Sequence, residues 1–596
     1  GKYRAIASGA IANGKPVVVN SAGTVSVVSG QTASVATAVV FETADAKTPR
    51  IAFDSSNNRI VISFRDQDNS GYGTAIVGTV ASNGSISFGT AVVYSSENTS
   101  TSGITFDSSN NKVVITYVPN SGYGTAKVGT VDSSDNSISF GSAATYLSSS
   151  TQESAAIVFD SSNNKVVVAA RDVGDSGKGK AFVGTVSGTS ISFGSAAEFN
   201  GAGTSYINSA FDSTNNKVII AYADAGNSEY GTAIVGTVSG TSISFGSEAV
   251  FESADSRWIS LAHDTSNQKT VIAYHDTGNS DYVTAIVGTV SGTSISFGTA
   301  VVVQSTSNYG TDTTFNSNDN LIVISYRDYA GTDLRIIDGT VSGTSISFGS
   351  SSIILDGGGY SPVDSTVASN HAVENIFDSN VNKTISVFRN MRNSNYGTAI
   401  AYTSAVPTNL TTENYIGIAN SCSFHGATET FTVTVASGAL YGGGGTGNVF
   451  YLNGLSNPPI QLLKGHTYIF DQSDSSNSGH PLHFKDTGGS QYTSGVTVTG
   501  SAGSSGAKVT IVIPSDATEP SQYYCTSHGN GMGNLITIGD SFVNVDVIGT
   551  VNDQQSSLTA GQQYFVQEDG TLGLTADSTS VLAGTAISAT ELVVKE

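Results

Sequence analysis

A short segment in the C-terminal third of the chain combines side chains that could bind a metal ion. The segment YYCTSHGNGMGN contains Cys525, His528 and Met532, with two and then three residues between them. His480 opens the strand-like segment HPLHFK further upstream. A thiolate, imidazoles and a thioether are soft donors, so these residue types suit a transition metal.

Strand alternation favours one of two nearby histidines as a partner for this segment. In a strand, successive side chains point to opposite faces. His480, Leu482 and Phe484 would then share one face, whereas His483 would point the other way. We therefore expect His480 to face the metal-binding segment.

The surrounding segments predict a small β-sandwich over residues 446–539. NVFYLNG, HTYIFDQSD, HPLHFK, AKVTIVIP and LITI all alternate as strands do. With its Cys-x2-His-x3-Met loop and isolated upstream histidine, this domain resembles the cupredoxin family of blue-copper domains. The resemblance implies a type 1 copper site in which His480, Cys525 and His528 are equatorial ligands and Met532 is the weak axial ligand.

Three alternatives to a redox copper site stay open. The fold could be inherited without its metal, or Cys525 could pair with Cys422 in a disulfide. A bound copper ion could also serve only to hold its loops together.

A second set of polar residues recurs along the first two thirds of the chain. Guanidinium groups beside carboxylates suit a sialidase or glycosidase, where arginines hold a substrate carboxylate and paired acids do the chemistry. A catalytic site needs one asymmetric set of residues, however, and the arginine–aspartate pair recurs at the same place in most repeats. We therefore expect local ion pairs and no enzyme activity, with glycan binding by the same rim still open. The candidate rim residues are Arg65, Asp66, Arg171, Asp172, His275, Asp276, Arg327, Asp328 and Arg389.

The elements that position this rim come from an internal repeat. The repeat opens on Phe-Asp or an equivalent pair, with a period of 52 or 53 residues and one of 62. Each repeat contains four strand-like segments and no helical pattern, as in the blade of a β-propeller. The openings are Asp54, Asp107, Asp160, Asp212, Asp264, Asn316 and Asp378.

The two ends of the array complement each other. Residues 33–54 match 242–264, which is a fourth strand followed by the next opening, and the last repeat stops near Ala405 without a fourth strand. Pairing the two ends removes both exposed sheet edges. The sequence therefore predicts an all-β chain with a seven-bladed β-propeller over 32–405, closed by an N-terminal strand.

Two weaker interpretations of the array remain. The same hairpins could form an open solenoid with capped edges. The DSSNN turns could bind calcium, although one carboxylate per turn is few for a hard cation.

Charge and hydropathy exclude several partners. The formal net charge is −22, with 25 basic against 47 acidic residues. Nucleic-acid binding needs a dense basic face, so we expect no such partner. No run of about 18 apolar residues is present, so we expect no membrane insertion.

The terminal segments predict a further β-domain. Residues 1–31 form a β-ribbon, and 406–441 and 540–596 carry similar hairpin patterns, with 442–445 as a glycine hinge. The phrases NYIGIANS, GATETFTVTVASG, LTAGQQYFVQEDGTL and SVLAGTAISATELVVK resemble modules of structural proteins in tailed phages of marine bacteria, especially phages of cyanobacteria. Proteins of that group often carry a cupredoxin-like domain as well.

This resemblance implies a function for the whole chain. It implies a non-enzymatic fibre, capsid or tail appendage on the virion surface, outside the cell. Its partners would be other virion proteins, contacted through the terminal β-domain, and a host-surface glycan or receptor. The rivals are a polysaccharide-acting propeller enzyme and an extracellular copper redox protein or adhesin. The sequence does not predict the oligomeric state.

Overall fold

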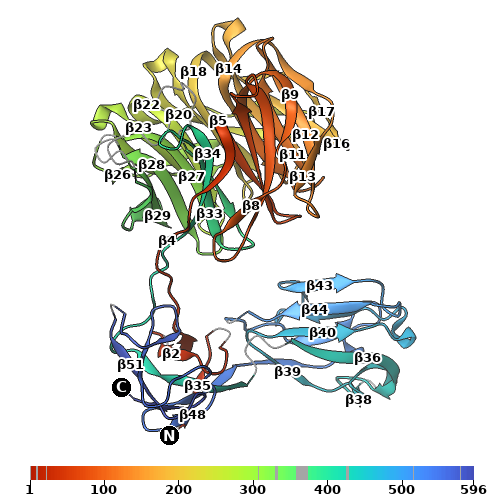
Figure 1. Ribbon diagram of the computed structural model, residues 1–596. Coiled ribbons are helices and arrows are strands. Elements are labelled where there is room, and N and C mark those ends of the chain that lie inside the picture. The colour runs from red at the N-terminus through yellow and green to blue at the C-terminus, as the bar shows by residue number, and fades with distance from the viewer. Residues whose placement is uncertain are drawn as a thin grey trace. The chain divides into compact units, whose positions relative to one another are not determined.

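The protein is described from a computed structural model (Figure 1). It describes residues 2–8, 11–21, 23–306, 308–328, 333–356, 373–423, 428–443, 445–514, 516–577 and 579–595. The chain divides into the repeat domain, Thr32–Val406, and the terminal unit, made of Gly1–Gln31 and Pro407–Glu596. The described residues form strands and a few 3-10 turns but no α-helix, so the chain is all-β, with mostly antiparallel sheets. Within these residues, no helix is long and apolar enough to cross a membrane.

Each repeat begins with a three-stranded antiparallel meander. The first strands are β5 (Val39–Asp54), β10 (Ser100–Asp107), β14 (Ala144–Asp160), β18 (Ala197–Asp212), β22 (Ala249–Asp264), β27 (Asn308–Asn316) and β32 (Val373–Asp378). The second strands are β6 (Arg59–Asp66), β11 (Lys112–Val118), β15 (Lys165–Asp172), β19 (Lys217–Asp224), β23 (Lys269–Asp276), β28 (Leu321–Asp328) and β33 (Lys383–Asn390). The third strands are β7 (Tyr72–Val80), β12 (Tyr123–Asp132), β16 (Lys178–Ser187), β20 (Tyr230–Ser239), β24 (Tyr282–Ser291), β29 (Leu334–Ser342) and β34 (Tyr396–Thr403).

In each sheet, the third strand pairs on its outer side with two segments: a short strand, and the segment that leads into the next repeat. In β5, β14, β18 and β22 this segment is continuous with the next first strand, so one long strand serves two sheets. The short strands are β4 (Ser34–Val35), β8 (Ile86–Phe88), β13 (Ser137–Phe140), β17 (Ser190–Phe193), β21 (Ser242–Phe245), β25 (Ser294–Phe297) and β30 (Ser345–Phe348), and the separate leading segments are β9 (Val92–Asn98), β26 (Val301–Gln304) and β31 (Ser352–Leu355). Turns η1 (Val173–Asp175), η2 (Ala225–Asn227) and η3 (Thr277–Asn279) follow three of the second strands.

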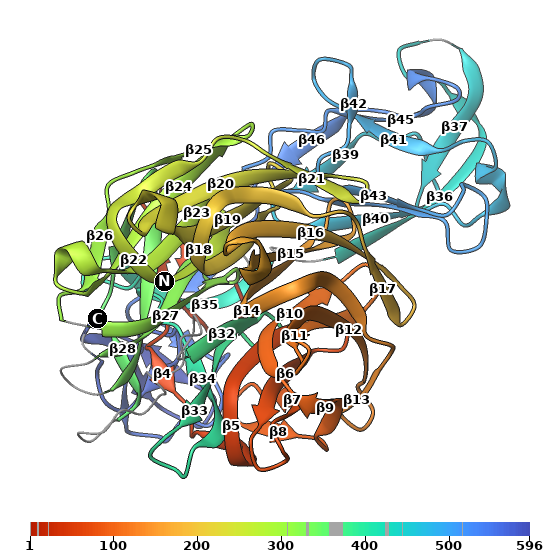
Figure 2. The same cartoon turned by 90° about the horizontal axis from the view of Figure 1, so that it is seen from above.

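The first strands contact one another in chain order, and β32 also contacts β5. At the closing sheet, β34 pairs antiparallel with β5, placing Ala399 opposite Val39, and with β4, placing Tyr402 opposite Val35. Strands β34 and β5 lie side by side in Figures 1 and 2. The predicted pairing between the two ends of the array is therefore present.

The closing sheet uses the same packing as the other sheets. In the third strands, a Cβ at Gly231 would overlap the ring of Phe251, and a Cβ at Gly397 would overlap the ring of Phe41. Phe41 comes from the N-terminal end of the array and Gly397 from its C-terminal end. Glycine at this position lets an aromatic ring cross the strand and fill the core between sheets.

The DSSNN turns are Asx turns. The Asp54 Oδ1 atom accepts hydrogen bonds from the backbone N–H groups of Ser56 and Asn57, both at 3.0 Å, and its Oδ2 accepts from Asn57 Nδ2 at 2.8 Å. The same bonds recur at Asp107, Asp160, Asp212 and Asp264. Because N–H donors occupy both carboxylate oxygens, these turns are structural rather than calcium sites.

One buried charge cluster connects β5, β27 and β32, which are the first strands of the first, sixth and seventh repeats. Arg50 Nη1 donates to Glu374 Oε2 at 3.1 Å, and Glu374 Oε1 accepts from the Ile51 N–H at 3.4 Å. Asp312 Oδ2 accepts from the Asn375 N–H at 2.6 Å. Each carboxylate therefore bonds to the backbone of the neighbouring first strand, across a boundary where the described strands form no sheet ladder.

Segments from three parts of the sequence form the main sheet of the terminal unit. Its order is β1 (Lys2–Ile6), β47 (Phe542–Asp546), β35 (Tyr415–Ser423), β2 (Pro16–Val19) and β3 (Val25–Val27). A second small sheet contains β48 (Val551–Asn552), β52 (Leu592–Val594), β51 (Val581–Ala586), β49 (Gln563–Val566) and β50 (Leu572–Gly573). The repeat domain is thus inserted, in sequence, between strands of one sheet.

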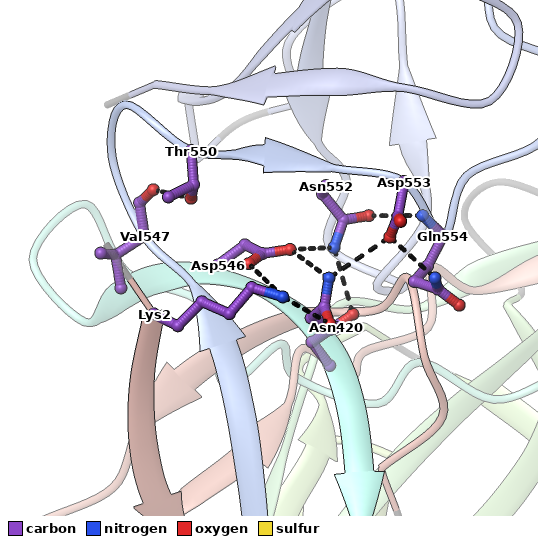
Figure 3. Close-up of polar contacts among 9 residues, drawn as sticks. Lys2, Asn420, Asp546, Val547, Thr550, Asn552, Asp553 and Gln554 are labelled. Atoms are coloured by element: carbon purple, nitrogen blue, oxygen red, sulfur yellow. Dashed lines mark hydrogen bonds and ion pairs between the residues drawn. The ribbon is translucent and has the colours of Figure 1, made fainter.

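A polar network holds these distant segments together (Figure 3). Asp546 is fully buried, and its Oδ2 accepts from Asn420 Nδ2 at 2.7 Å and from Asn552 Nδ2 at 2.9 Å. Lys2 Nζ donates to Asn420 Oδ1 at 3.0 Å. These bonds tie the N-terminal strand, the middle of the chain and the C-terminal segment to one carboxylate.

The remaining strands form a sandwich around a second core. One sheet has the order β38 (Leu455–Ser456), β37 (Thr446–Leu452), β36 (Thr428–Ala439), β40 (Thr467–Asp471), β44 (Lys508–Val512) and β43 (Val496–Thr499). The others contain β39 (Ile460–Leu463) with β46 (Ile536–Gly539), and β42 (Gln491–Tyr492), β41 (Leu482–Lys485) and β45 (Gln522–Cys525). Turns η4 (Ser475–Asn477) and η5 (Asn530–Met532) lie between strands.

Two boundary predictions are wrong here. Residues 428–439 do not belong with the terminal β-domain, because β36 pairs with β37 and β40 and contributes Val433 to the sandwich core. The predicted hinge at 442–445 is also wrong, because Gly442, Gly443 and Gly445 lie in the turn of the β36–β37 hairpin; Gly444 lies outside the described residues. Gly442, Gly443 and Gly445 have φ of 85°, 79° and 87°, the left-handed conformation that such a turn requires.

Candidate functional site

The structure brings three of the four predicted metal ligands together. The ligand atoms of His480, Cys525 and His528 all lie within 4.8 Å of one another. Cys525 Sγ is 3.5 Å from His528 Nδ1, and the rings of His480 and His528 have centroids 4.4 Å apart. Met532, the fourth, is buried in the same hydrophobic cluster as Cys525.

A tight turn after β45 folds His528 back toward Cys525. Gly529 N–H donates to the Cys525 carbonyl at 2.8 Å, and Cys525 N–H donates to the Gly529 carbonyl at 3.4 Å. Gly529 has a φ of 86°, which favours glycine at this position. This one turn is therefore enough to place the side chains of Cys525 and His528 next to each other.

His480 is held from the other side by a loop, not by a strand as predicted. Strand β41 begins at Leu482, which lies opposite Cys525 in the pairing with β45. Gln472 Nε2 donates to the His480 carbonyl at 3.0 Å, and Gln472 Oε1 accepts from the Leu482 N–H at 3.0 Å. Sequence reasoning missed Gln472, although a glutamine directly after the strand HTYIFD was a visible signal.

The other histidines of the sandwich lie outside this group. His483 Nδ1 is 2.9 Å from Gln491 Nε2, as expected for a side chain on the opposite face of β41. His466 is fully buried and stacks on Tyr468, with ring centroids 5.8 Å apart. Of the two histidines that alternation compared, His480 is the one that groups with Cys525 and His528.

Burial sets the protonation of the site. Burial raises the pKa of the Cys525 thiol, opposed by hydrogen bonds from the backbone of Ser527 and His528. Burial, and then the neighbouring His528, lower the pKa of His480. The His480 imidazole is therefore neutral near pH 7, the form that binds metals.

The residues present fit a soft metal ion. His480 Nδ1 is buried and has no hydrogen-bond partner among the described residues. Cys525 is a free thiol, which is contrary to a disulfide; the Cys422 side chain lies outside the described residues. A thiolate and two imidazoles would hold copper, and the Met532 thioether would be a weak further donor.

The predicted rim residues lie at the C-terminal ends of second strands, but many are covered. Their surroundings are ion pairs and turn caps: Asp172 Oδ2 accepts from Lys180 Nζ at 2.7 Å, and Arg389 Nε donates to Asp45 Oδ1 at 2.6 Å. Asp66 Oδ1 caps a turn by accepting from the Asn69 N–H at 3.1 Å. The buried members are Asp172, His275, Asp276, Arg327 and Asp328.

Burial also changes the chemistry available at this rim. It lowers the pKa of His275 to about 4, so this imidazole is neutral near pH 7. Burial, and then the charge of Glu252, raise the pKa of Asp276. Sequence reasoning missed the aromatic residues Tyr206 and Trp258, which lie in this region; the single Trp of the chain was the available signal.

Comparisons with known proteins do not assign a family. No protein-family model and no curated protein matches the sequence. A solved protein from Lactobacillus plantarum has a TM-score of 0.40 at 12% identity, covering 60% of this chain and 97% of that one. A point mutant of NanB sialidase from Streptococcus pneumoniae has a TM-score of 0.36 at 12% identity, covering 61% and 70%. AofleA from Arthrobotrys oligospora has a TM-score of 0.34 at 9% identity, covering 58% and 97%. With TM-scores below 0.5, these likenesses carry no argument about function.

Proposed function

We propose that this chain is a non-enzymatic protein of a virion surface, a fibre or a capsid or tail appendage. Its terminal unit docks on other virion proteins, and its repeat domain adheres to a host-surface glycan or receptor. The similarity of its terminal segments to phage structural modules supports the location. The rest of the proposal follows from how the chain is assembled.

The observation that carries this proposal is the composite terminal sheet. β1 and β47 come from distant parts of the sequence and pair with each other, and β2 pairs with β35. Both chain connections to the repeat domain therefore leave from one sheet. Such an insertion suits a display module on an anchoring domain, because its two attachment points cannot separate while the sheet persists.

We infer that the repeat domain is a seven-bladed β-propeller. The cyclic contact of its first strands supports this, as does the pairing of β34 with β5. Closure pairs the two ends of the array with each other, so neither end is left as an unpaired edge, which suits a protein exposed outside the cell.

We infer that residues 428–539 form a cupredoxin-like domain with a type 1 copper site. The grouping of His480, Cys525 and His528 supports this inference. In a non-enzymatic surface protein, the ion would serve to join the loops before β41 and after β45. An extracellular copper redox protein is the second candidate, and the same grouping favours it.

The absence of catalysis is proposed from the repeated bracing. Asp172 pairs with Lys180 across the loop between β15 and β16, and Arg389 pairs with Asp45 of β5 in the closing sheet. A glycosidase instead needs two carboxyl groups flanking one bond.

Two measurements test the proposed function. Purified full-length chain should be retained on bacterial surface polysaccharide without release of reducing ends; hydrolysis that Arg65→Ala or Arg327→Ala abolishes would favour the enzyme. Gold-labelled antibody against the chain should decorate phage particles whose genome encodes it. Particles that contain no such chain by mass spectrometry would contradict the virion location.

A further inference from the structure

We propose that Tyr206 and Trp258 form a stacking surface for a neutral hexose in the repeat domain. This inference deepens the proposed adhesive function and rests on it. The two residues occupy equivalent places in consecutive repeats, each six residues before the opening aspartate.

Both aromatic residues sit at β-bulges in a left-handed conformation. The ladder between β18 and β19 shifts between Ser205 and Asn208, and that between β22 and β23 shifts between Arg257 and Ser260. The φ angles are 51° at Tyr206 and 43° at Trp258. Large side chains rarely adopt this conformation because the Cβ crowds the backbone.

The bulge itself does not require an aromatic residue. The same position is Thr48 in the first repeat and Gly310 in the sixth, with φ of 45° and 60°. Glycine satisfies this conformation without strain. Two consecutive repeats therefore retain a strained aromatic residue where glycine would serve the fold, and strain of this kind marks functional sites.

The two rings lie next to each other, and a third ring packs against Trp258. The centroids of Tyr206 and Trp258 are 5.9 Å apart, with planes inclined at 56°. His275 is buried, and its ring packs edge to face against Trp258 at 4.9 Å. Tyr206 and Trp258 are themselves only partly buried, so each leaves part of its ring accessible.

Hydrogen-bonding groups surround this aromatic pair. Arg257 Nη2 lies 2.5 Å from Asp255 Oδ2, and these two side chains are 44% and 28% exposed. Ser205 Oγ donates to Glu229 Oε2 at 3.0 Å. The charges of Arg257, Asp255 and Glu229 all act on the Tyr206 phenol, so these groups lie close to it.

The charge balance selects the ligand class. Asp281 Oδ1 lies 3.5 Å from His275 Nε2, so Glu229, Asp255 and Asp281 are the acidic members of this group, whereas Arg257 is its one base and His275 is neutral near pH 7. An excess of carboxylates repels an anionic sugar but accepts hydrogen bonds from the hydroxyl groups of a neutral one. Aromatic faces beside such acceptors suit the apolar face and the hydroxyl edge of a hexose.

The single Trp makes this site directly observable. Full-length chain is titrated with the methyl glycosides of glucose, galactose and mannose while Trp258 fluorescence is followed. We expect a saturable change with at least one of them. Tyr206→Gly should weaken that binding roughly tenfold, because it removes one stacking ring, and should raise the thermal midpoint by relieving the strain. Tyr206→Phe should keep most of the affinity.

Tyr123→Ala is the matched control, because Tyr123 is 43% exposed in another repeat. It should leave binding unchanged. Absence of a saturable change with every sugar would overturn the inference, as would a response to choline or N-acetylneuraminic acid alone, or unchanged binding in Tyr206→Gly. Retention on surface polysaccharide is measured separately. If the unmodified chain is retained but Trp258 fluorescence does not change with any sugar, this site is refuted and adhesion is not. If the unmodified chain is not retained, adhesion itself is refuted.

Discussion

Replacing Arg50 with Met should strongly destabilise the repeat domain. Arg50 and Glu374 are 3.1 Å apart, with side chains 3% and 17% exposed. Asp312 is buried nearby, and its pKa is raised well above its usual range by burial and then by the charge of Glu374, with Arg50 opposing the rise. Removing one member of a buried pair leaves an uncompensated charge, at a cost of about 3–5 kcal/mol.

The loss should depend on pH in a defined direction. The pKa of Glu374 is raised from its ordinary value of 4.5, mainly by burial. The folded state therefore binds more protons than the unfolded state above pH 4.5, and stability falls as pH rises through the folded pKa values. Without Arg50 these pKa values rise further. The deficit of Arg50→Met should thus be complete near pH 7 and should shrink toward pH 4.

Urea unfolding of the full chain, followed by Trp258 fluorescence, measures this effect. Trp258 is the single Trp and lies in the repeat domain, so the signal does not report on the terminal unit. With a slope of about 3 kcal/mol/M, the midpoint should fall by at least about 1 M. The double variant Arg50→Met/Glu374→Met should recover much of the loss. Lys178→Met, which removes exposed ion pairs only, should stay close to the parent.

Two results would refute this reasoning. An unchanged midpoint for Arg50→Met at pH 7 would mean that the cluster contributes nothing to closure. A deficit of the same size at pH 4 and pH 7 would mean that packing, rather than the unpaired carboxylates, sets the cost.

Three further predictions concern other parts of the chain. Adding Cu(II) to the full chain should produce an intense blue absorption that Cys525→Ser abolishes, because the thiolate-to-copper bond is lost; absence of colour at any copper loading would exclude the type 1 site. Gly397→Ala should lower the thermal midpoint about as much as Gly231→Ala, since both would push a Cβ into an aromatic ring; a milder effect at Gly397 would show that the closing sheet packs more loosely. The pKa of His275 is lowered from 6.5 to about 4 by burial, so the folded state binds fewer protons between these values and stability falls as pH falls through that window. His275→Gln should flatten this part of the stability curve in acid titration, and an unchanged slope would contradict the assignment.

Local and repeated signals were enough to predict the strands of the array. Phe41 could be matched to Phe251 because both precede a repeat opening in equivalent sequence. The same comparison predicted that the N-terminal segment would pair with the last strand of the array, and Val39 lies opposite Ala399 there. The proximity of Cys525 and His528 was likewise predictable, since it depends on one short turn.

Pairings over long distances could not be predicted in the same way. β36 pairs in parallel with β40 and antiparallel with β37, and nothing in the alternation of its residues distinguishes this from a place in the terminal sheet. The glycine run 442–445 is equally compatible with a linker and with a tight turn. Only the partner strand decides between them.

The sequence by itself determined the alternation, the repeat and the soft donor set, because these properties reside in residue types and their spacing. Only the tertiary structure decided which polar groups are buried away from solvent. Arg50, Asp312 and Glu374 occupy the same position of three repeats, and they meet only because the first strands close on themselves. His275 and Asp276 looked like a binding rim, but neighbouring strands cover them. Burial depends on what packs on top of a residue, and that is a property of the folded chain.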